Sequence, residues 1–129
     1  MNRMIWGAAA LVLSAGMAAA DPLEGLWQTP KDDNGNSGLV QIAPCGPQLC
    51  GTLVKAYGPN GGEIDSGNIG RAIVSETVPT GGGSYEGKIY SPDRGKTYAS
   101  KLSLSGQTLA VQGCVFGICR DGGTWRRVK

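Results

Sequence analysis

The sequence predicts an all-β protein, a small closed or nearly closed barrel of eight antiparallel strands connected up and down. No stretch shows a convincing helical period of about 3.6 residues, and 22 glycines and seven prolines interrupt any such pattern. Short alternating or β-rich runs recur instead, separated by turn residues. We expect eight such strands to form a meander that closes on itself, because closure removes unpaired sheet edges.

The expected strands follow one another with recognisable turns between them. The clearest turn surrounds Pro92, which presets φ for a first turn position, and ends at Gly95, which can adopt a positive φ. Residues 58–70 show no strand pattern and are expected to form a surface loop, and the three glycines at 81–83 are expected to form a flexible hairpin tip. The expected strands are 25–29, 38–45, 49–57, 72–78, 85–91, 97–104, 108–115 and 124–128.

Residues 1–20 have the features of a secretory signal peptide. Arg3 supplies the basic start, an apolar run follows from residue 5 to 13, and small residues end at Ala20. Cleavage after Ala20 would leave 129 − 20 = 109 residues, which we expect to form one domain over 21–129. The mature chain is expected to be a soluble monomer in the periplasm or outside the cell.

The composition argues against several function classes. Without Arg3, 12 − 1 = 11 basic residues face 10 acidic ones, a balance that gives no footprint for nucleic acid. Apart from the signal, no apolar run approaches the ~20 residues that span a bilayer, so we expect no stable membrane insertion. Histidine is absent, and no serine lies in a nucleophile-elbow motif. We therefore expect no catalytic residue, no cofactor and no enzymatic activity.

Four cysteines, Cys45, Cys50, Cys114 and Cys119, are an even number in a chain expected to be exported, which favours disulfides. Three connectivities are open to them. Each neighbouring pair encloses four residues, and a four-residue hairpin loop would place its two cysteines opposite each other. We therefore favour the local bridges Cys45–Cys50 and Cys114–Cys119. A zinc site is the alternative, since four thiolates can bind zinc and its paired cysteines usually enclose two to four residues, but export normally oxidises such cysteines, so no metal is expected.

Two motifs near the ends of the chain carry a family likeness. Gly25 and Trp27 begin the first expected strand, and Trp125, Arg126 and Arg127 lie in the last. This arrangement resembles the calycin barrels, the lipocalins and their relatives, in which a cationic side chain from the last strand packs across the tryptophan ring of the first. The resemblance implies that these tryptophans and arginines close one end of a calycin-like barrel as a structural plug.

More specifically, the chain resembles a family of exported bacterial proteins called domain of unknown function 2147. The strongest match is the segment 87–93 continuing into 95–98. The other matching segments are 21–27, 44–46, 49–51, 70–71, 111–114 and 124–125. The chain departs from the family pattern in the glycine-rich loop 58–70 and at 121–123. The family has no established activity, so the resemblance implies a fold and an exported location.

Three residues are candidates for ligand contact. Tyr90 and Tyr98 flank the Pro92 turn and could stack on a ligand at the barrel mouth, and Arg71 could meet an anion. Their structural alternatives are cross-strand packing for the tyrosines and simple solvation for the arginine.

The leading functional hypothesis is a non-enzymatic barrel that binds a small apolar or amphipathic ligand. The alternative is a protein-binding module, such as a periplasmic inhibitor of a protease or lysozyme, that would use the Cys45–Cys50 tip or the 58–70 loop. A structural envelope factor is a third hypothesis. A hollow interior lined by Leu102, Leu104, Val111 and tyrosines would favour the first, whereas a filled interior would favour the others.

Overall fold

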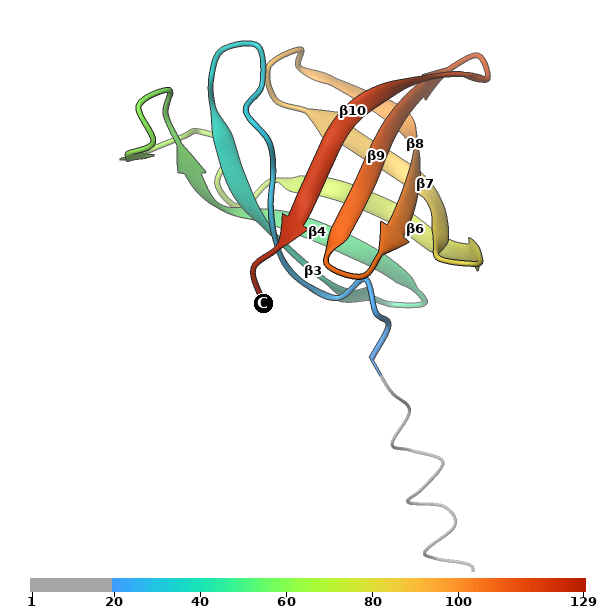
Figure 1. Ribbon diagram of the computed structural model, residues 1–129. Coiled ribbons are helices and arrows are strands. Elements are labelled where there is room, and N and C mark those ends of the chain that lie inside the picture. Colours follow the sequence, from blue (N-terminus) through green and yellow to red (C-terminus); the bar gives the residue numbers. More distant parts are fainter. Residues whose placement is uncertain (1–19) are drawn as a thin grey trace, which may run out of the picture.

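The computed structural model describes residues 20–129, and the predicted signal peptide therefore lies outside the described residues except for Ala20. The described chain forms a closed antiparallel barrel of eight strands with one extra short strand (Figure 1). The strands are β2 (Gly25–Gln28), β3 (Ser37–Cys45), β4 (Gln48–Tyr57), β5 (Glu63–Ile64), β6 (Ala72–Gly81), β7 (Ser84–Ser91), β8 (Lys96–Ser105), β9 (Thr108–Val115) and β10 (Ile118–Arg127).

The predicted up-and-down topology is confirmed. Apart from β5, each strand pairs antiparallel with the next one along the chain. The barrel closes where β10 pairs with β2, with Arg127 opposite Trp27. No helix in residues 20–129 is long and apolar enough to cross a membrane.

Two strand predictions need correction. The last strand begins at Ile118 instead of residue 124, because the segment 121–123 forms a bulge within β10 in place of the expected connection. The Asp121 carboxylate accepts the backbone N–H of Gly123 at 2.9 Å there, and glycine inside a strand commonly marks such a bulge. The expected surface loop 58–70 contains β5, which pairs with the end of β4 and projects from the barrel wall (green in Figure 1).

Both local disulfides are formed, but the hairpins that carry them are tighter than predicted. Each hairpin turns over two residues, 46–47 and 116–117, where the sequence predicted four-residue loops. Cys114 and Cys119 are direct partners with their Cα atoms 4.0 Å apart. Cys45 instead pairs with Gln48, so the Cys45–Cys50 bridge runs diagonally across its hairpin with a Cα separation of 5.8 Å.

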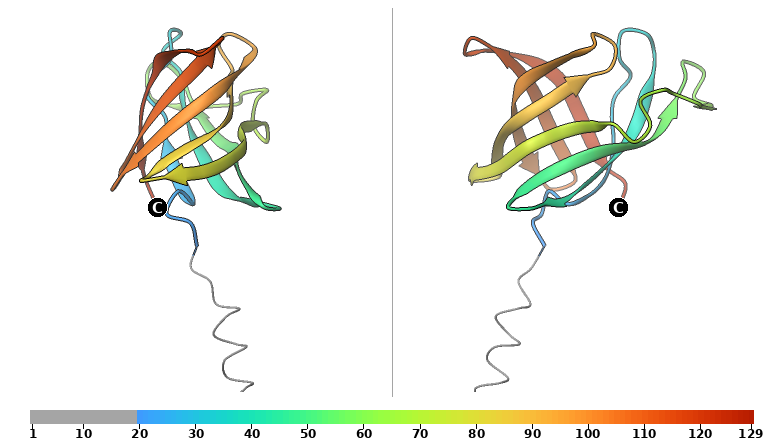
Figure 2. Two further views of the ribbon diagram at one scale, coloured as in Figure 1. Left: turned by 90° about the vertical axis from the view of Figure 1, so that its right-hand side faces the viewer. Right: turned by 180° about the vertical axis from the view of Figure 1, so that it is seen from behind.

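The barrel has two different ends, which we call the closed end and the open end. The turns at 46–47, 82–83 and 106–107 lie at the closed end together with the C-terminus (Figures 1 and 2). The loop 29–36 and the turns at 92–95 and 116–117 lie at the open end. The two disulfides therefore tie hairpins at opposite ends of the molecule.

Large apolar side chains fill the interior toward the closed end. Alternating residues of the strands face inward, as the pleat requires, and form one core cluster. Leu23 and Trp27 are completely buried within this cluster. Its members are Leu23, Trp27, Val40, Ile42, Leu49, Leu53, Ile73, Val74, Tyr85, Leu102, Leu109, Val111 and Trp125.

The segment that precedes β2 plugs the closed end. The indole N–H of Trp27 donates to the carbonyl oxygen of Leu23 at 3.0 Å, which fixes Leu23 in the core. The Asp21 carboxylate accepts the backbone N–H of Leu23 at 2.8 Å and the hydroxyl of Tyr85 at 2.5 Å. Burial, together with this bond to Asp21, raises the pKa of Tyr85 above its usual range.

Arg127 holds the plug from the last strand. Its guanidinium lies over the Trp27 ring, 4.5 Å from the ring centroid, and donates to the carbonyl oxygens of Glu24 at 2.8 Å and Pro22 at 2.5 Å. The neighbouring Arg126 is exposed. Of the two arginines that the resemblance offered for this position, Arg127 is therefore the one that covers the ring.

Replacing Arg127 with alanine should lower the free energy of unfolding by about 2 kcal/mol, because the change removes a cation–π contact and two charged hydrogen bonds. Arg126→Ala is the matched control and should change stability by less than about 0.5 kcal/mol. Urea unfolding of both variants checks the prediction. Equal losses would contradict the role given to Arg127.

Tyr85 should make stability sensitive to alkaline pH. A tyrosine whose pKa is raised by folding contributes stability below its unfolded pKa of about 10 and loses that contribution as the pH rises further. Tyr85→Phe should cost about 1–2 kcal/mol at neutral pH and should weaken the decline in stability above about pH 10. Unfolding measured from pH 7 to pH 11 tests this, and parallel profiles for the two proteins would count against it.

Candidate functional site

A cavity of about 1000 Å³ occupies the open end of the barrel and communicates with solvent. Its inner wall is apolar and consists of core side chains from six different strands. These residues are Val40, Leu53, Ile73, Ile89, Val111 and Trp125. The interior is therefore filled toward the closed end and hollow toward the open end.

Strand β8 shows where the filled part gives way to the hollow part. Tyr98, Ser100, Leu102 and Leu104 are the more buried residues of the strand and share its inner face. Of these four, Tyr98 lines the cavity, whereas Leu102 and Leu104 belong to or pack against the core cluster. Of the residues named for a possible hollow interior, Val111 and the tyrosines Tyr90 and Tyr98 line the cavity, whereas the two leucines lie nearer the closed end.

Glycines on the inner wall mark the same boundary. A Cβ atom built on Gly51 would lie 2.8 Å from a methyl carbon of Val40, and one on Gly87 would lie 2.7 Å from the carbonyl oxygen of Ser75. At Gly113, which lines the cavity, the first atom met would be Cβ of Tyr98 at an ordinary 3.5 Å. The barrel is therefore tightly packed around Gly51 and Gly87 and has room at Gly113.

A buried hydroxyl lies beside this open region. Ser100 pairs directly with Gly113 across β8 and β9 and is almost fully buried. Within residues 20–129 its hydroxyl makes no hydrogen bond. Ser100 also pairs directly with Gly87 and is not among the residues that line the cavity, so it lies at the boundary between the packed and the open part.

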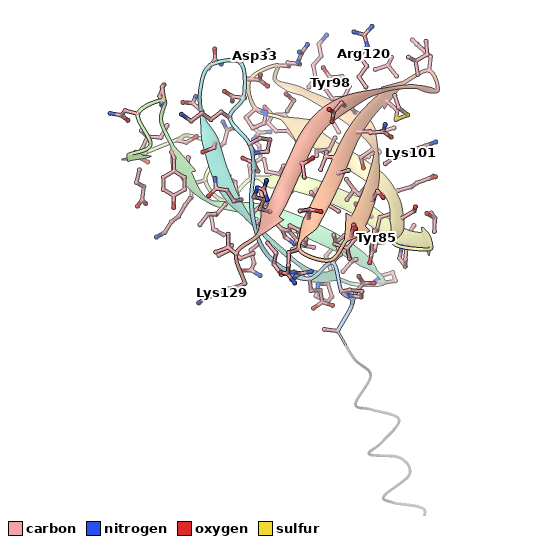
Figure 3. All side chains as sticks on the ribbon, viewed as in Figure 1. Asp33, Tyr85, Tyr98, Lys101, Arg120 and Lys129 are labelled. Carbon is pink, nitrogen blue, oxygen red and sulfur yellow. A yellow bond between two sulfur atoms is a disulfide. The ribbon has the colours of Figure 1, made fainter. Side chains whose placement is uncertain are left out.

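Charged side chains surround the cavity mouth. They are Lys31, Asp32, Asp33, Asp93, Arg94, Arg120 and Asp121. The Arg94 guanidinium lies 3.7 Å from the Asp33 carboxylate and links the turn at 92–95 to the loop 29–36, although both side chains are largely exposed and such pairs stabilise little. Figure 3 shows Asp33, Tyr98 and Arg120 at this end and Tyr85 and Lys129 at the other.

Local hydrogen bonds already occupy several of these carboxylates. Asp32 accepts the backbone N–H groups of Asn34 and Asn36, each at 2.9 Å, and Asp93 accepts the Ser91 hydroxyl at 2.5 Å. Among the described residues, no group of three or more histidine, cysteine or acidic side chains could hold a metal ion. The rim is thus polar and mixed in charge.

The structure separates the residues that the sequence singled out. Tyr90 and Tyr98 both line the cavity, and Arg71 stacks on Tyr90 with its guanidinium 4.3 Å from the ring centroid. Trp27 lies at the closed end with Arg127, whereas Trp125 also lines the cavity. Arg71 is not among the lining residues, so its contact with the site runs through Tyr90.

Several lining residues were missed by sequence reasoning. Phe116, Ile118 and Arg120 border the mouth, but their segment was not predicted to be a strand. The available signal was the second cysteine pair, because a hairpin closed at Cys114 and Cys119 implies a strand on either side of the turn. Ile73 was missed for a different reason, since an irregularity in the pairing of β4 with β6 places neighbouring Ile73 and Val74 both in the core.

Comparison with known proteins gives two matches. A family model described as "Uncharacterized protein conserved in bacteria (DUF2147)" matches residues 25–127. The structure of protein HP1028 from Helicobacter pylori, described as belonging to the lipocalin family, superimposes with a TM-score of 0.65 at 19% sequence identity, covering 86% of this chain and 85% of that one. This likeness establishes the lipocalin-like fold. No curated protein matches the sequence.

The two inward glycines should respond differently to the same substitution. Gly87→Ala should lower stability by about 1–3 kcal/mol through overpacking against β6. Gly113→Ala should be neutral or stabilising by up to about 1 kcal/mol, because its site has room and the unfolded chain loses freedom. Denaturant unfolding of both variants decides this, and an equal loss at Gly113 would mean that this part of the barrel is filled.

Proposed function

This chain belongs to DUF2147, a family of uncharacterised bacterial proteins, and we propose that it binds a small apolar or amphipathic ligand in the cavity at its open end. The main observation in support of this proposal is a cavity of about 1000 Å³ whose wall is apolar and whose mouth carries charged side chains. Sites for drug-sized ligands start near ~300 Å³ and are mostly apolar with a few polar contacts. We propose that the cavity binds this ligand without chemical change, a role that the lipocalin-like fold supports.

The arrangement suggests how such a ligand is held. Its apolar part would lie against Val40, Ile73 and Trp125, where water is displaced most favourably. Tyr90 and Tyr98 would contact it nearer the mouth, and Arg71 would hold the Tyr90 ring in position. A polar end group would remain among the charged side chains of the rim.

We further propose that the chain is cleaved after Ala20 and acts as a monomeric domain, residues 21–129, in the periplasm or outside the cell. The two disulfides support an oxidising compartment. The backbone nitrogen of Asp21 donates to the Glu24 carboxylate at 2.9 Å. Cleavage would turn this nitrogen into an ammonium group beside that carboxylate, so the new N-terminus would be held in the plug.

A native mass spectrum of the protein purified gently from the periplasm tests both proposals. We expect a mass that begins at Asp21, together with a noncovalent adduct of a few hundred daltons that dissociates on activation. A retained signal segment would contradict the processing step alone.

Binding of a dansyl-labelled fatty acid to the parent protein and to two leucine variants tests whether the ligand lies in the cavity. Gly113→Leu places a large side chain in the cavity, and we expect it to weaken binding at least tenfold. Ala110→Leu adds the same side chain to an exposed position of the same strand and should bind normally. Binding that is equal in both variants, or absent from the parent protein, would contradict cavity binding and favour the protein-binding alternative.

A further inference from the structure

The hairpin between β9 and β10 carries an exposed apolar tip, consisting of Val115, Phe116, Gly117 and Ile118. The Phe116 side chain is 100% exposed, Ile118 is 68% exposed and Val115 is 49% exposed. The tip projects at the open end of the barrel (red, at the upper right of Figure 1). Phe116 is the single phenylalanine of the sequence, and it packs nowhere in the core.

The backbone at Phe116 is unfavourable for this residue type. Its φ is 52°, in the left-handed region that bulky side chains rarely adopt. The other two-residue turns of the barrel place glycine at the same first position, with φ values of 65° at Gly46, 64° at Gly82 and 61° at Gly106. Turn geometry therefore favours glycine or asparagine here, and burial does not explain the phenylalanine either.

The second described non-glycine residue with a positive φ makes a useful contrast. Glu76 lies at an irregularity in β6, and its carboxylate pairs with the Lys88 ammonium group at 3.2 Å. Its side chain thus has a partner within the fold. Phe116 combines an unfavourable backbone with full exposure, a combination that points to function rather than to stability.

The Cys114–Cys119 disulfide holds the tip in this conformation. The two cysteines are direct partners on either side of the turn. Cys114 directly precedes Val115, and Cys119 directly follows Ile118. The bridge prevents the hairpin from opening and burying Phe116 elsewhere. Phe116 and Ile118 also border the mouth of the cavity, so the tip and the mouth form one continuous surface.

We propose that the apolar tip docks the open end of the barrel on a phospholipid bilayer, with Phe116 and Ile118 entering the boundary between headgroups and acyl chains. Three apolar side chains on one convex hairpin provide far less than the ~800 Å² per partner that a stable protein interface buries. Insertion into a bilayer gains free energy in proportion to the apolar surface that it buries, so a tip of this size gives weak attachment. The docking is peripheral and reversible.

The charges near the tip fit the same occupant. Residues 114–120 carry one charged side chain, the cation of Arg120, which would lie at the level of the headgroup phosphates. Around the rest of the mouth four acidic side chains outnumber two basic ones, so apolar insertion, and not net charge, would supply the binding. Docking would place the cavity mouth against the source of apolar ligands, but it does not depend on what the cavity binds.

Cosedimentation of the mature protein with vesicles of phosphatidylcholine and phosphatidylglycerol tests the proposal. We expect binding that survives raised salt, and at least a fivefold loss of the bound fraction in the variant carrying Phe116→Ser and Ile118→Ser. Val78→Ser removes an exposed apolar side chain from β6, away from the tip, and should bind normally. Absence of binding in the parent, or equal binding in the tip variant, would overturn the proposal and leave a protein pocket as the partner of the tip.

Two further comparisons separate this proposal from ligand binding and from misfolding. Gly113→Leu should lose the dansyl fatty acid yet still bind vesicles, because it fills the cavity and leaves the tip unchanged. Phe116→Trp adds an exposed fluorophore to the buried Trp27 and Trp125, and the variant's emission should shift to shorter wavelength on adding vesicles while that of the parent does not. An unshifted emission would show that the tip does not enter the bilayer.

Paired serine replacements of the cysteines test the function of the bridge. Removing Cys114 and Cys119 together should weaken vesicle binding severalfold, because the tip is no longer held. Removing Cys45 and Cys50 together removes a bridge of equal sequence separation at the closed end and should leave vesicle binding unchanged. Equal effects of the two pairs would contradict a specific role for the bridge at the tip.

Discussion

The pairing of the first barrel strand with the last determines how the interior is divided. It places Arg127 of β10 opposite Trp27 of β2, and the arginine then covers the tryptophan ring and holds the segment before β2 across the barrel. An eight-stranded barrel has an interior just wide enough for side chains or one small ligand. Leu23 and Trp27 are completely buried at one end, and the cavity lies at the other.

The division follows from the sizes of the inward side chains. Toward the closed end, Tyr85, Leu102 and Leu109 meet the plug and leave no room. Toward the open end, Gly113 lies beside Ser100 and Tyr98, and the wall there is apolar without being filled. A protein of this size can therefore have both a packed core and a cavity in one barrel, because the core and the cavity are lined by different parts of the same strands.

The two disulfides have equal spacing but serve different surfaces. The bridge at the closed end ties a turn of Gly46 and Pro47, in which glycine takes the positive φ that the turn requires. The bridge at the open end ties a turn in which Phe116 takes that conformation while fully exposed. The proposed membrane docking would bring the cavity, with its apolar wall, and the apolar tip beside its mouth to the same lipid surface.

The sequence by itself determined the strand order and favoured the local disulfides, because turn residues, alternation and cysteine spacing are local signals. The contact of an arginine with Trp27 was implied by the resemblance to calycin barrels. Alternation along β8 puts Tyr98, Ser100, Leu102 and Leu104 on one face. Tertiary structure alone decided that Tyr98 lines a cavity while Leu102 is packed in the core. Alternation specifies a face of a strand, whereas depth within the barrel depends on the register of strands far apart in the chain. The bulge at 121–123 in β10, and with it the position of Arg120, follows from the same long-range pairing.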